Sequence, residues 1–302
     1  PPPTPPCEHQ HAGSDATIQI NMDRADGATL VTSNLGGRGG PAGTGSPSPP
    51  VLRFGNVATW GGRAVDLQIS TISEYIANNA QLNTFDGLFG NVNLKMRRTS
   101  AQQGFAGSVQ LRYTLMYAGT DDPVNMRHTR FSFFDLDMSP CGGIFECMQA
   151  QGGMIEETVA ADSELDVYDV SADGMATANG ASPFSATPDG YDIWPTSTAG
   201  TSSLFCATRN GIGGDNPIDP LAMTAQQSSR SVQLTFDGVA SMDVRYLLIG
   251  GRCNSNNAGR NFLFAGASNV LPPCEVLPSQ PPPPPSPHPP PPVLPPLPAP
   301  PS

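Results

Sequence analysis

Two aspartates at the end of an apolar run are the residues of this sequence best suited to bind a metal ion. Asp135 and Asp137 follow residues 131–134 (FSFF), and Glu157 lies further along the chain. Alternate residues of an extended chain point to the same side, so the two aspartates can present their carboxylates together. Calcium takes carboxylate oxygens as ligands. The pattern predicts a calcium site at Asp135, Asp137 and Glu157, although solvated turn aspartates would show the same spacing.

The sequence gives less evidence for catalytic groups than for a metal site. Asp135 and Glu157 would serve as the acid and base of a wall-modifying glycoside hydrolase only across a substrate cleft, at a separation that a sequence does not give. No G-x-S-x-G motif is present, Lys95 is the only lysine, and His128 lies among arginines. The glycine-rich residues 211–217 lack the Lys-Ser/Thr of a phosphate-binding loop. We therefore expect a protein that is not an enzyme.

Six cysteines and no C-x-x-C motif favour disulfides formed in an oxidising compartment. A zinc site at Cys7, His9 and His11 would lack the usual spacing and a fourth ligand. Two cysteines bracket a five-residue loop, and two others flank the proline-rich ends of the chain. Of the fifteen connectivities that six cysteines allow, the expected pairs are Cys141–Cys147, Cys7–Cys274 and Cys206–Cys253.

Three aromatic residues are candidates for binding at the surface. Trp60, Trp194 and Tyr191 can stack on sugar rings or receive a proline-rich segment, and they can equally be core residues.

The elements that would position these residues are short strands. Apolar and polar residues alternate with a period of two, and Gly, Asp, Asn and Pro mark the turns between them, which indicates an all-β antiparallel β-sandwich or jelly roll. Asp26-Gly27 is expected to join the first two strands as a hairpin turn. Short helices are expected at residues 70–82 and 221–227. Strands are expected at residues 18–22, 30–31, 65–69, 92–96, 109–117, 131–134, 165–170, 232–236, 244–249 and 262–264.

Proline-rich segments frame this body. We divide the chain into an N-terminal proline-rich segment (1–6), a β-sandwich body (7–274) with a long Gly/Pro/Ser loop at 34–50, and a C-terminal tail (275–302). The interval 171–201 is expected to be an excursion from the sandwich. Because proline fixes φ and lacks a backbone donor, residues 281–301 favour a polyproline II rod about 65 Å long at roughly 3.1 Å per residue.

The tail also offers sites for sugars. No N-x-Ser/Thr sequon occurs in the sequence, so any glycans are expected to be O-linked. The expected acceptors are Ser286 and, after hydroxylation, Pro281, Pro282, Pro283, Pro284, Pro285 and Pro287.

Charge and hydropathy exclude two classes of partner. The chain has 26 acidic and 15 basic residues, a net charge of −11, which argues against nucleic acid as a partner. No window approaches 18 consecutive apolar residues, so we expect no membrane span. The chain begins at Pro1, which fits either a cleaved leader or a piece of a longer product. Together with the cysteines, this predicts a secreted protein of the cell surface or wall.

The proline tail resembles a known class of proteins. Repeated prolines with Ser286 among them are similar to the hydroxyproline-rich glycoproteins of green algae and related protists, meaning cell-wall, pherophorin-type and mastigoneme proteins. Within the body, residues 117–124 (YAGTDDPV) and 131–137 (FSFFDLD) resemble a motif of secreted and cell-surface β-sandwich domains. The resemblance implies an extracellular structural role, with arabinose- or galactose-type O-glycans on hydroxyproline.

The expected function is therefore that of a structural glycoprotein subunit of an extracellular filament, sheath or wall. It would bind copies of itself, with its polyproline segment docking on a neighbouring subunit. No cofactor is expected beyond calcium. The alternative is a secreted carbohydrate-binding, lectin-like module on a rigid proline-rich stalk.

Overall fold

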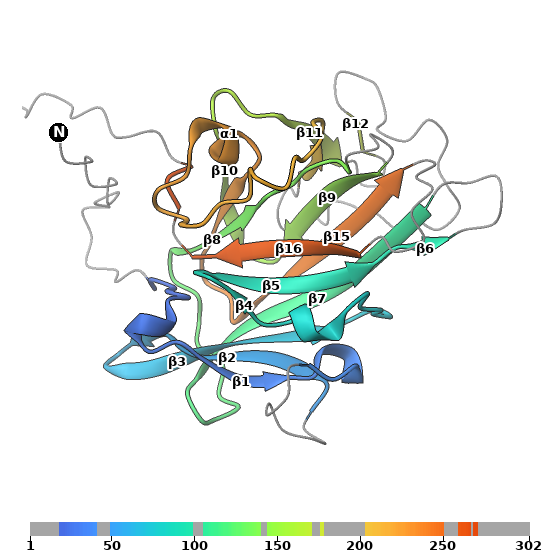
Figure 1. Ribbon diagram of the computed structural model, residues 1–302. Helices are drawn as coiled ribbons and strands as arrows, with labels where there is room; N and C mark the ends of the chain where they lie inside the picture. The colour runs from blue at the N-terminus through green and yellow to red at the C-terminus, as the bar shows by residue number, and fades with distance from the viewer. Residues whose placement is uncertain are drawn as a thin grey trace, which may run out of the picture.

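The protein is an all-β sandwich of two antiparallel sheets (Figure 1). A computed structural model describes residues 18–40, 49–98, 105–139, 144–170, 176–177, 203–250, 259–266 and 268–270. In this described part, α1 (Ala225–Ser229) is the single α-helix, beside the 3-10 turns η1 (Arg24–Asp26), η2 (Leu35–Gly37) and η3 (Ala80–Leu82). None of the described helices is long and apolar enough to cross a membrane.

The larger sheet has ten described strands. Its order is β1 (Thr29–Ser33), β2 (Val51–Trp60), β3 (Arg63–Thr71), β7 (Phe105–Tyr117), β15 (Ser241–Gly250), β9 (Ile144–Gln151), β13 (Leu204–Ala207), β11 (Leu165–Val170) and β12 (Ala176–Thr177), and β6 (Arg97–Arg98) also pairs with β7. The smaller sheet has six described strands, in the order β10 (Met154–Val159), β14 (Val232–Phe236), β8 (Thr129–Phe134), β16 (Gly259–Ala265), β5 (Phe89–Lys95) and β4 (Phe85–Asp86).

The core lies between the two sheets. In Figure 1, β16 and β5 of the smaller sheet lie across β15 and β7 of the larger one. The inward-facing Tyr113 of β7 meets Phe264 of β16 edge-on, with ring centroids 5.3 Å apart, and Tyr246 of β15 stacks on Phe262 at 4.1 Å. All four side chains are buried, and burying a large apolar side chain stabilises a fold by about 1.5–3 kcal/mol.

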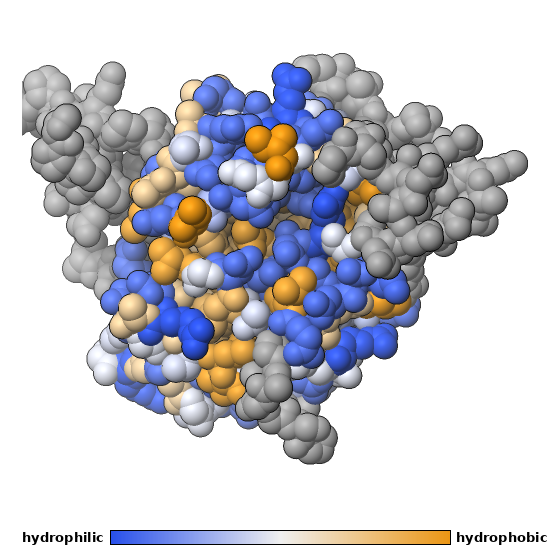
Figure 2. Space-filling model, viewed as in Figure 1, coloured by the Kyte–Doolittle hydropathy of each residue, from blue (hydrophilic) through white to orange (hydrophobic). Residues whose placement is uncertain are grey.

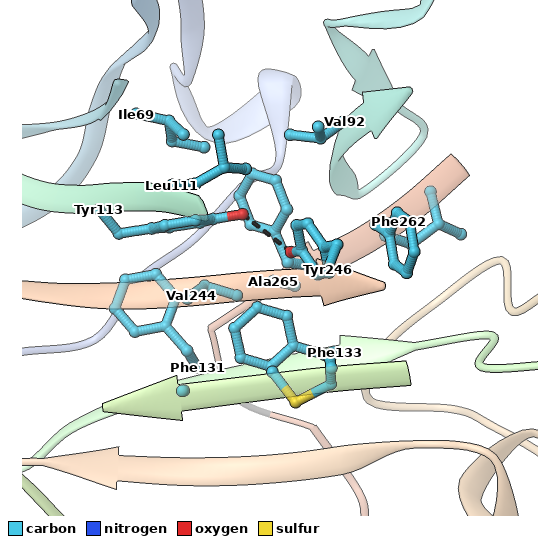
Figure 3. Close-up of a cluster of buried hydrophobic side chains, with 14 of the residues drawn as sticks. Ile69, Val92, Leu111, Tyr113, Phe131, Phe133, Val244, Tyr246, Phe262 and Ala265 are labelled. Carbon is cyan, nitrogen blue, oxygen red and sulfur yellow. Dashed lines mark hydrogen bonds between the residues drawn. The ribbon is translucent and has the colours of Figure 1, made fainter. Parts of the chain in front are cut away.

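Two tyrosines form a polar contact inside this apolar core. The hydroxyl oxygens of Tyr113 and Tyr246 are 2.9 Å apart, from neighbouring strands of the larger sheet (Figure 3). Burial raises the pKa of both phenols above their ordinary value. Both hydroxyls therefore remain protonated, and the hydrogen bond joins β7 to β15.

Most of the predicted strands are confirmed. Nine of them, at residues 30–31, 65–69, 92–96, 109–117, 131–134, 165–170, 232–236, 244–249 and 262–264, coincide with or overlap β1, β3, β5, β7, β8, β11, β14, β15 and β16. Along β7 the alternation predicted from the sequence holds, because Val109, Leu111, Tyr113 and Leu115 are all fully buried. Burial on one face fixes the register of such a strand.

The predicted first hairpin is wrong. Residues 18–22 alternate between buried and exposed, yet they form no strand. Their backbone reaches the sandwich through single bonds, such as the one from Asn21 N to Val57 O at 2.7 Å. The Asp23 carboxylate accepts from Ala25 N and starts η1, which ends at Gly27 with a φ of 102°. Leu30 consequently pairs with Phe54 of β2.

The two predicted helices fare differently. Residues 70–71 belong to β3, Ile72 N donates to Gln110 O, and only η3 is helical within the predicted 70–82 segment. That prediction is wrong because the chain continues to pair along β7. The helix predicted at 221–227 is found as α1, slightly later, where Thr224 and Gln227 form a capping box.

The sheets end in edge strands of two kinds. β4 and β12 each have two residues. β1 and β10 are longer, but the register of each shifts against its neighbour, between Leu30 and Thr32 in β1 and between Met154 and Glu156 in β10. Such shifts mark β-bulges, which twist an edge away from regular pairing.

The disulfide of the described part joins Cys147 of β9 to Cys206 of β13. The two residues are directly opposite one another in the strand register, with Cα atoms 4.1 Å apart. The predicted pairs Cys141–Cys147 and Cys206–Cys253 are therefore wrong, because strand pairing brings together cysteines 59 positions apart in the chain. The Cys7–Cys274 pair lies outside the described residues.

Candidate metal centre

Three aspartates meet where β8 and β9 adjoin a loop that precedes α1. Asp135 directly follows β8 and has a left-handed backbone with a φ of 58°. Asp137 lies on the next stretch of chain, and Asp215 belongs to the loop between β13 and α1. One carboxylate oxygen from each residue lies within 4.8 Å of the other two. The three side chains thus form one acidic cluster, called here the aspartate cluster.

Backbone hydrogen bonds fix the middle of this cluster. Met138 N donates to Arg209 O at 2.7 Å, and Gly211 N donates to Met138 O at 2.8 Å. On the other side, Glu146 N of β9 donates to Asp137 O at 3.2 Å. The segment that carries Asp137 is therefore held between β9 and the loop after β13.

Gly211 leaves the space that the Asp137 carboxylate fills. A Cβ atom at position 211 would lie 1.6 Å from Asp137 Oδ2 and 2.4 Å from its Cγ. No side chain other than hydrogen fits there without a shift of the aspartate. The close approach of a carboxylate thus explains why a glycine fits at this position.

Two arginines neutralise part of the surrounding charge. Arg230 forms ion pairs with Asp215 and, at 2.8 Å, with Glu164. Arg260 Nε lies 3.2 Å from Oε1 of Glu146. Arg230 and Asp215 are both buried, so their pair is shielded from screening by solvent.

Asp135 and Asp137 remain without a partner cation in the part of the chain that the structure describes. Counting full charges, five carboxylates (Asp135, Asp137, Glu146, Glu164 and Asp215) face two guanidinium groups, which leaves 5 − 2 = 3 negative charges uncompensated. Partly buried like charges at this spacing repel one another, and the energy is relieved by protonation or by a bound cation.

Burial and neighbouring charges raise the pKa values of both aspartates. Burial, followed by the charges of Asp137 and Asp215, raises the pKa of Asp135 from 3.8 to about 7, while Arg230 and Arg260 act in the opposite direction. Burial also raises the pKa of Asp137 to about 6, although Arg260 lowers it. A bound cation would therefore stabilise the ionised form of this cluster most near neutral pH.

Glu146 adds a buried acceptor beside the aspartate cluster. Its side chain lies on β9, is 3% exposed and has one oxygen, Oε2, without a hydrogen-bond partner among the described residues. Burial raises the pKa of Glu146 well above its ordinary value, and the charges of Asp137 and Asp135 add to this effect. A buried acceptor without a partner costs about 1–3 kcal/mol, so this oxygen also favours a cation nearby.

The oxygen spacing agrees with one hard cation. Calcium binds oxygens at 2.3–2.6 Å, so two of its ligands are separated by at most about 5 Å. Magnesium, at 2.0–2.1 Å, allows a separation of only about 4 Å. The chemistry available here is therefore cation binding or sharing of protons among carboxylates.

The structure brings together two of the three residues predicted to bind calcium. Asp135 and Asp137 belong to the aspartate cluster, but Glu157 is elsewhere, on β10, where its carboxylate accepts from Ser203 N at 2.9 Å and from Ser203 Oγ at 2.6 Å. The sequence reasoning missed Asp215 and Glu146. The sequence signal for Asp215 is an acidic residue within the glycine-rich stretch 211–217.

The predicted aromatic site is described only in part. Trp60 is at the end of β2, half-buried, and directly opposite Arg63 in the register with β3. The Arg63 guanidinium lies 3.7 Å above the ring of Tyr117. Trp194, Tyr191 and the expected O-glycan acceptors of residues 281–287 lie outside the described residues.

No protein-family model matches this chain, and no curated protein is significantly similar to it in sequence. The features that define the protein are thus those of its own fold: an antiparallel β-sandwich with a disulfide between two adjacent strands and a cluster of carboxylates at one end of the sheets.

Proposed function

We propose that this chain is a non-enzymatic structural subunit of an extracellular filament, sheath or wall. The observation that carries the proposal is the joining of a disulfide-containing β-sandwich to a run of prolines at residues 281–301. A disulfide is typical of secreted proteins, and a proline run is a stiff rod that loses little conformational entropy when it binds. A rigid body with a stiff arm is a suitable unit for head-to-tail assembly.

In this proposal the arm of one subunit docks on the sandwich of the next. Polyproline helices bind surfaces lined with aromatic rings, and the end of the β2–β3 hairpin carries such residues. Trp60, Arg63 and Tyr117 lie together there and are half-buried or exposed. O-linked sugars on Ser286 and on hydroxylated prolines would keep free arms soluble and belong to the same proposal.

Deletion of residues 281–302 tests the role of the arm. The truncated protein is expected to keep the melting temperature of the full chain but to sediment as a monomer, whereas the full chain forms larger species. Sedimentation velocity and electron microscopy of negatively stained samples provide the measurement. Assembly of the truncated protein to the same extent would refute the docking arm.

The Trp60→Ala variant tests the receiving surface. It is expected to weaken assembly while the fold, followed by circular dichroism, is retained. Ile218→Ala provides a matched control, because Ile218 is an apolar residue that is 85% exposed and lies far along the chain in the loop before α1. Equal effects of the two substitutions would contradict docking at Trp60.

A carbohydrate-binding function is the second candidate, and the exposed part of Trp60 favours it. Aromatic rings beside a hydrogen-bonding group such as Arg63 also stack on sugars. Binding of the full chain to a wall polysaccharide that Trp60→Ala abolishes, with assembly unchanged, would replace the docking proposal by this one.

A further inference from the structure

The aspartate cluster has the composition and spacing of a cation site, and among the described residues only Asp215 of its three members has an ion pair, with Arg230. Its two central members, Asp135 and Asp137, have no ion pair among the described residues, while each of the two nearby arginines is committed to another carboxylate. Three carboxylate oxygens within 4.8 Å of one another can contact a single ion.

Glu146 is the second, independent observation. Its side chain is almost completely buried, its Oε2 atom has no hydrogen-bond partner in the described part, and it interacts electrostatically with both Asp137 and Asp135. A buried carboxyl group next to two others is costly to ionise, since the interior does not solvate its charge. A divalent cation in the aspartate cluster would offset this cost without a direct bond to Glu146.

We propose that Asp135, Asp137 and Asp215 bind one calcium ion, with the buried Glu146 of β9 beside them as an outer group. The ion brings two positive charges to Asp135 and Asp137, which have no ion pair among the described residues. Remaining coordination positions are open to water, as calcium takes six to eight oxygen ligands.

Binding at this place would link three separate parts of the chain. Asp135 follows β8, Asp137 is bonded through its backbone to β9, and Asp215 belongs to the loop between β13 and α1. The ion therefore joins the smaller sheet to the larger one. Because the unfolded chain lacks this arrangement, calcium is expected to stabilise the folded protein.

Calorimetric titration and thermal melting of the full chain test the proposal. After removal of metals with a chelator, CaCl2 is expected to bind with a stoichiometry of one at this cluster. At a hundredfold excess over the dissociation constant, it is expected to raise the melting temperature by about 5 °C or more. MgCl2 is expected to bind at least about tenfold more weakly, because magnesium demands near-ideal octahedral geometry and gives up its bound water reluctantly.

Neutral variants of the ligands separate binding from folding. Asp137→Asn and Asp135→Asn keep the size of the side chain and remove like-charge repulsion, so the metal-free variants should melt at or above the wild-type temperature. Both are expected to lose the rise in melting temperature with calcium and to bind at least about tenfold more weakly.

Glu157→Gln is the matched control, because Glu157 is acidic and on a strand but bonds to Ser203 away from the cluster. It should keep the full calcium effect. The proposal is overturned if calcium neither binds nor shifts the wild-type melting temperature. It is overturned equally if the Asp137→Asn and Asp135→Asn variants respond like the wild type, or if magnesium binds as tightly as calcium.

Discussion

The narrow space between Gly211 and Asp137 makes one methyl group a sensitive probe of the acidic cluster. Gly211 has no left-handed φ, so its role comes from space and not from backbone conformation. Gly214, in the same loop, has an ordinary φ too, but nothing lies within 4 Å of a Cβ placed there. The two positions differ only in what a side chain would meet.

Gly211→Ala is expected to lower the free energy of unfolding by about 2 kcal/mol, the usual cost of overpacking, because the added methyl displaces the Asp137 carboxylate. Gly214→Ala should change it by less than about 0.5 kcal/mol. Urea denaturation of both variants gives the two values. Similar values for the two variants would show that the Asp137 side chain can move away without cost.

The metal-free protein is expected to lose stability as the pH rises from about 4 to 7. Asp135 and Asp137 have pKa values of about 7 and 6 in the folded protein, above the ordinary 3.8 of the unfolded chain. The folded state therefore binds protons more tightly than the unfolded state across this window, and ionisation penalises the fold. One pKa unit corresponds to about 1.4 kcal/mol, and partial exposure reduces the effect, so the total loss should be about 2 kcal/mol.

Urea denaturation with a chelator present, at pH values from about 4 to 8, measures this dependence. The other groups of the site are Asp215 and Glu146, with Arg230 and Arg260 facing them. The Asp135→Asn variant should show a flatter pH profile than the wild type. A wild-type stability that rises over this range would contradict the raised pKa values of the two aspartates.

The sequence predicted half of this site, and the physical reason is the range of the interactions. Asp135 and Asp137 were recognisable because they are close in sequence and follow an apolar strand. Asp215 joins them across some eighty positions, through the bonds of Met138 to the 209–211 segment, and no local pattern shows such pairing. Glu157 follows the predicted Cys141–Cys147 loop in sequence, but its strand, β10, is separated from β8 by β14.

At the scale of strands, the hydrogen bond between the buried Tyr113 and Tyr246 couples the stability of β7 to that of β15. Tyr246→Phe would leave the Tyr113 hydroxyl buried without its partner, and Tyr113→Phe would do the same to Tyr246 (Figure 3). Each single substitution should cost about 1–3 kcal/mol, the usual penalty for an unsatisfied buried polar group.

The double variant should be less destabilised than the sum of the two single variants, because an apolar pair of similar shape leaves no unsatisfied hydroxyl. A double-mutant cycle by urea denaturation gives the coupling energy. Strict additivity would mean that the two hydroxyls do not depend on each other.

The strand predictions are correct where the chain pairs with a neighbouring strand. They are wrong where isolated tertiary contacts replace the hydrogen bonds between strands. β11 and β14 have the predicted limits because their periodicity and turn residues agree. Residues 18–22 carry the same alternation, but they lie against the sandwich without pairing as a strand. Alternation thus reports burial of one face and not hydrogen bonding to a neighbour.

At the scale of the whole molecule, the link between Cys147 and Cys206 constrains a long stretch of the unfolded chain. The closed loop spans 59 positions and includes β10 and β11, so its loss should cost about 4 kcal/mol of stability by the loop-entropy relation. Thermal melting of the Cys147→Ala, Cys206→Ala double variant measures this loss.

Peptide mapping without reduction checks the pairing itself. The peptides that contain Cys147 and Cys206 are expected to be joined, and a peptide joining Cys141 to Cys147 would contradict the structure. The local pairing was predicted from short separation in sequence, whereas sheet register places the partner opposite.

The surface of the molecule agrees with its composition. The face shown in Figure 2 is covered mainly by hydrophilic residues, with apolar residues in smaller groups between them. With a net charge of −11, identical molecules repel one another over about 10 Å at 0.1 M salt. Any assembly must therefore rely on localised contacts that overcome this repulsion.

The edge strands add a constraint on how such a protein can polymerise. β4 and β12 are two residues long, and β1 and β10 are interrupted by bulges, so neither described sheet offers a long regular edge to a neighbouring chain. Short or bulged edges oppose the strand-by-strand addition that produces cross-β aggregates. A protein with such edges can remain folded at high concentration until it binds its partner. The short or bulged edge strands oppose growth into amyloid.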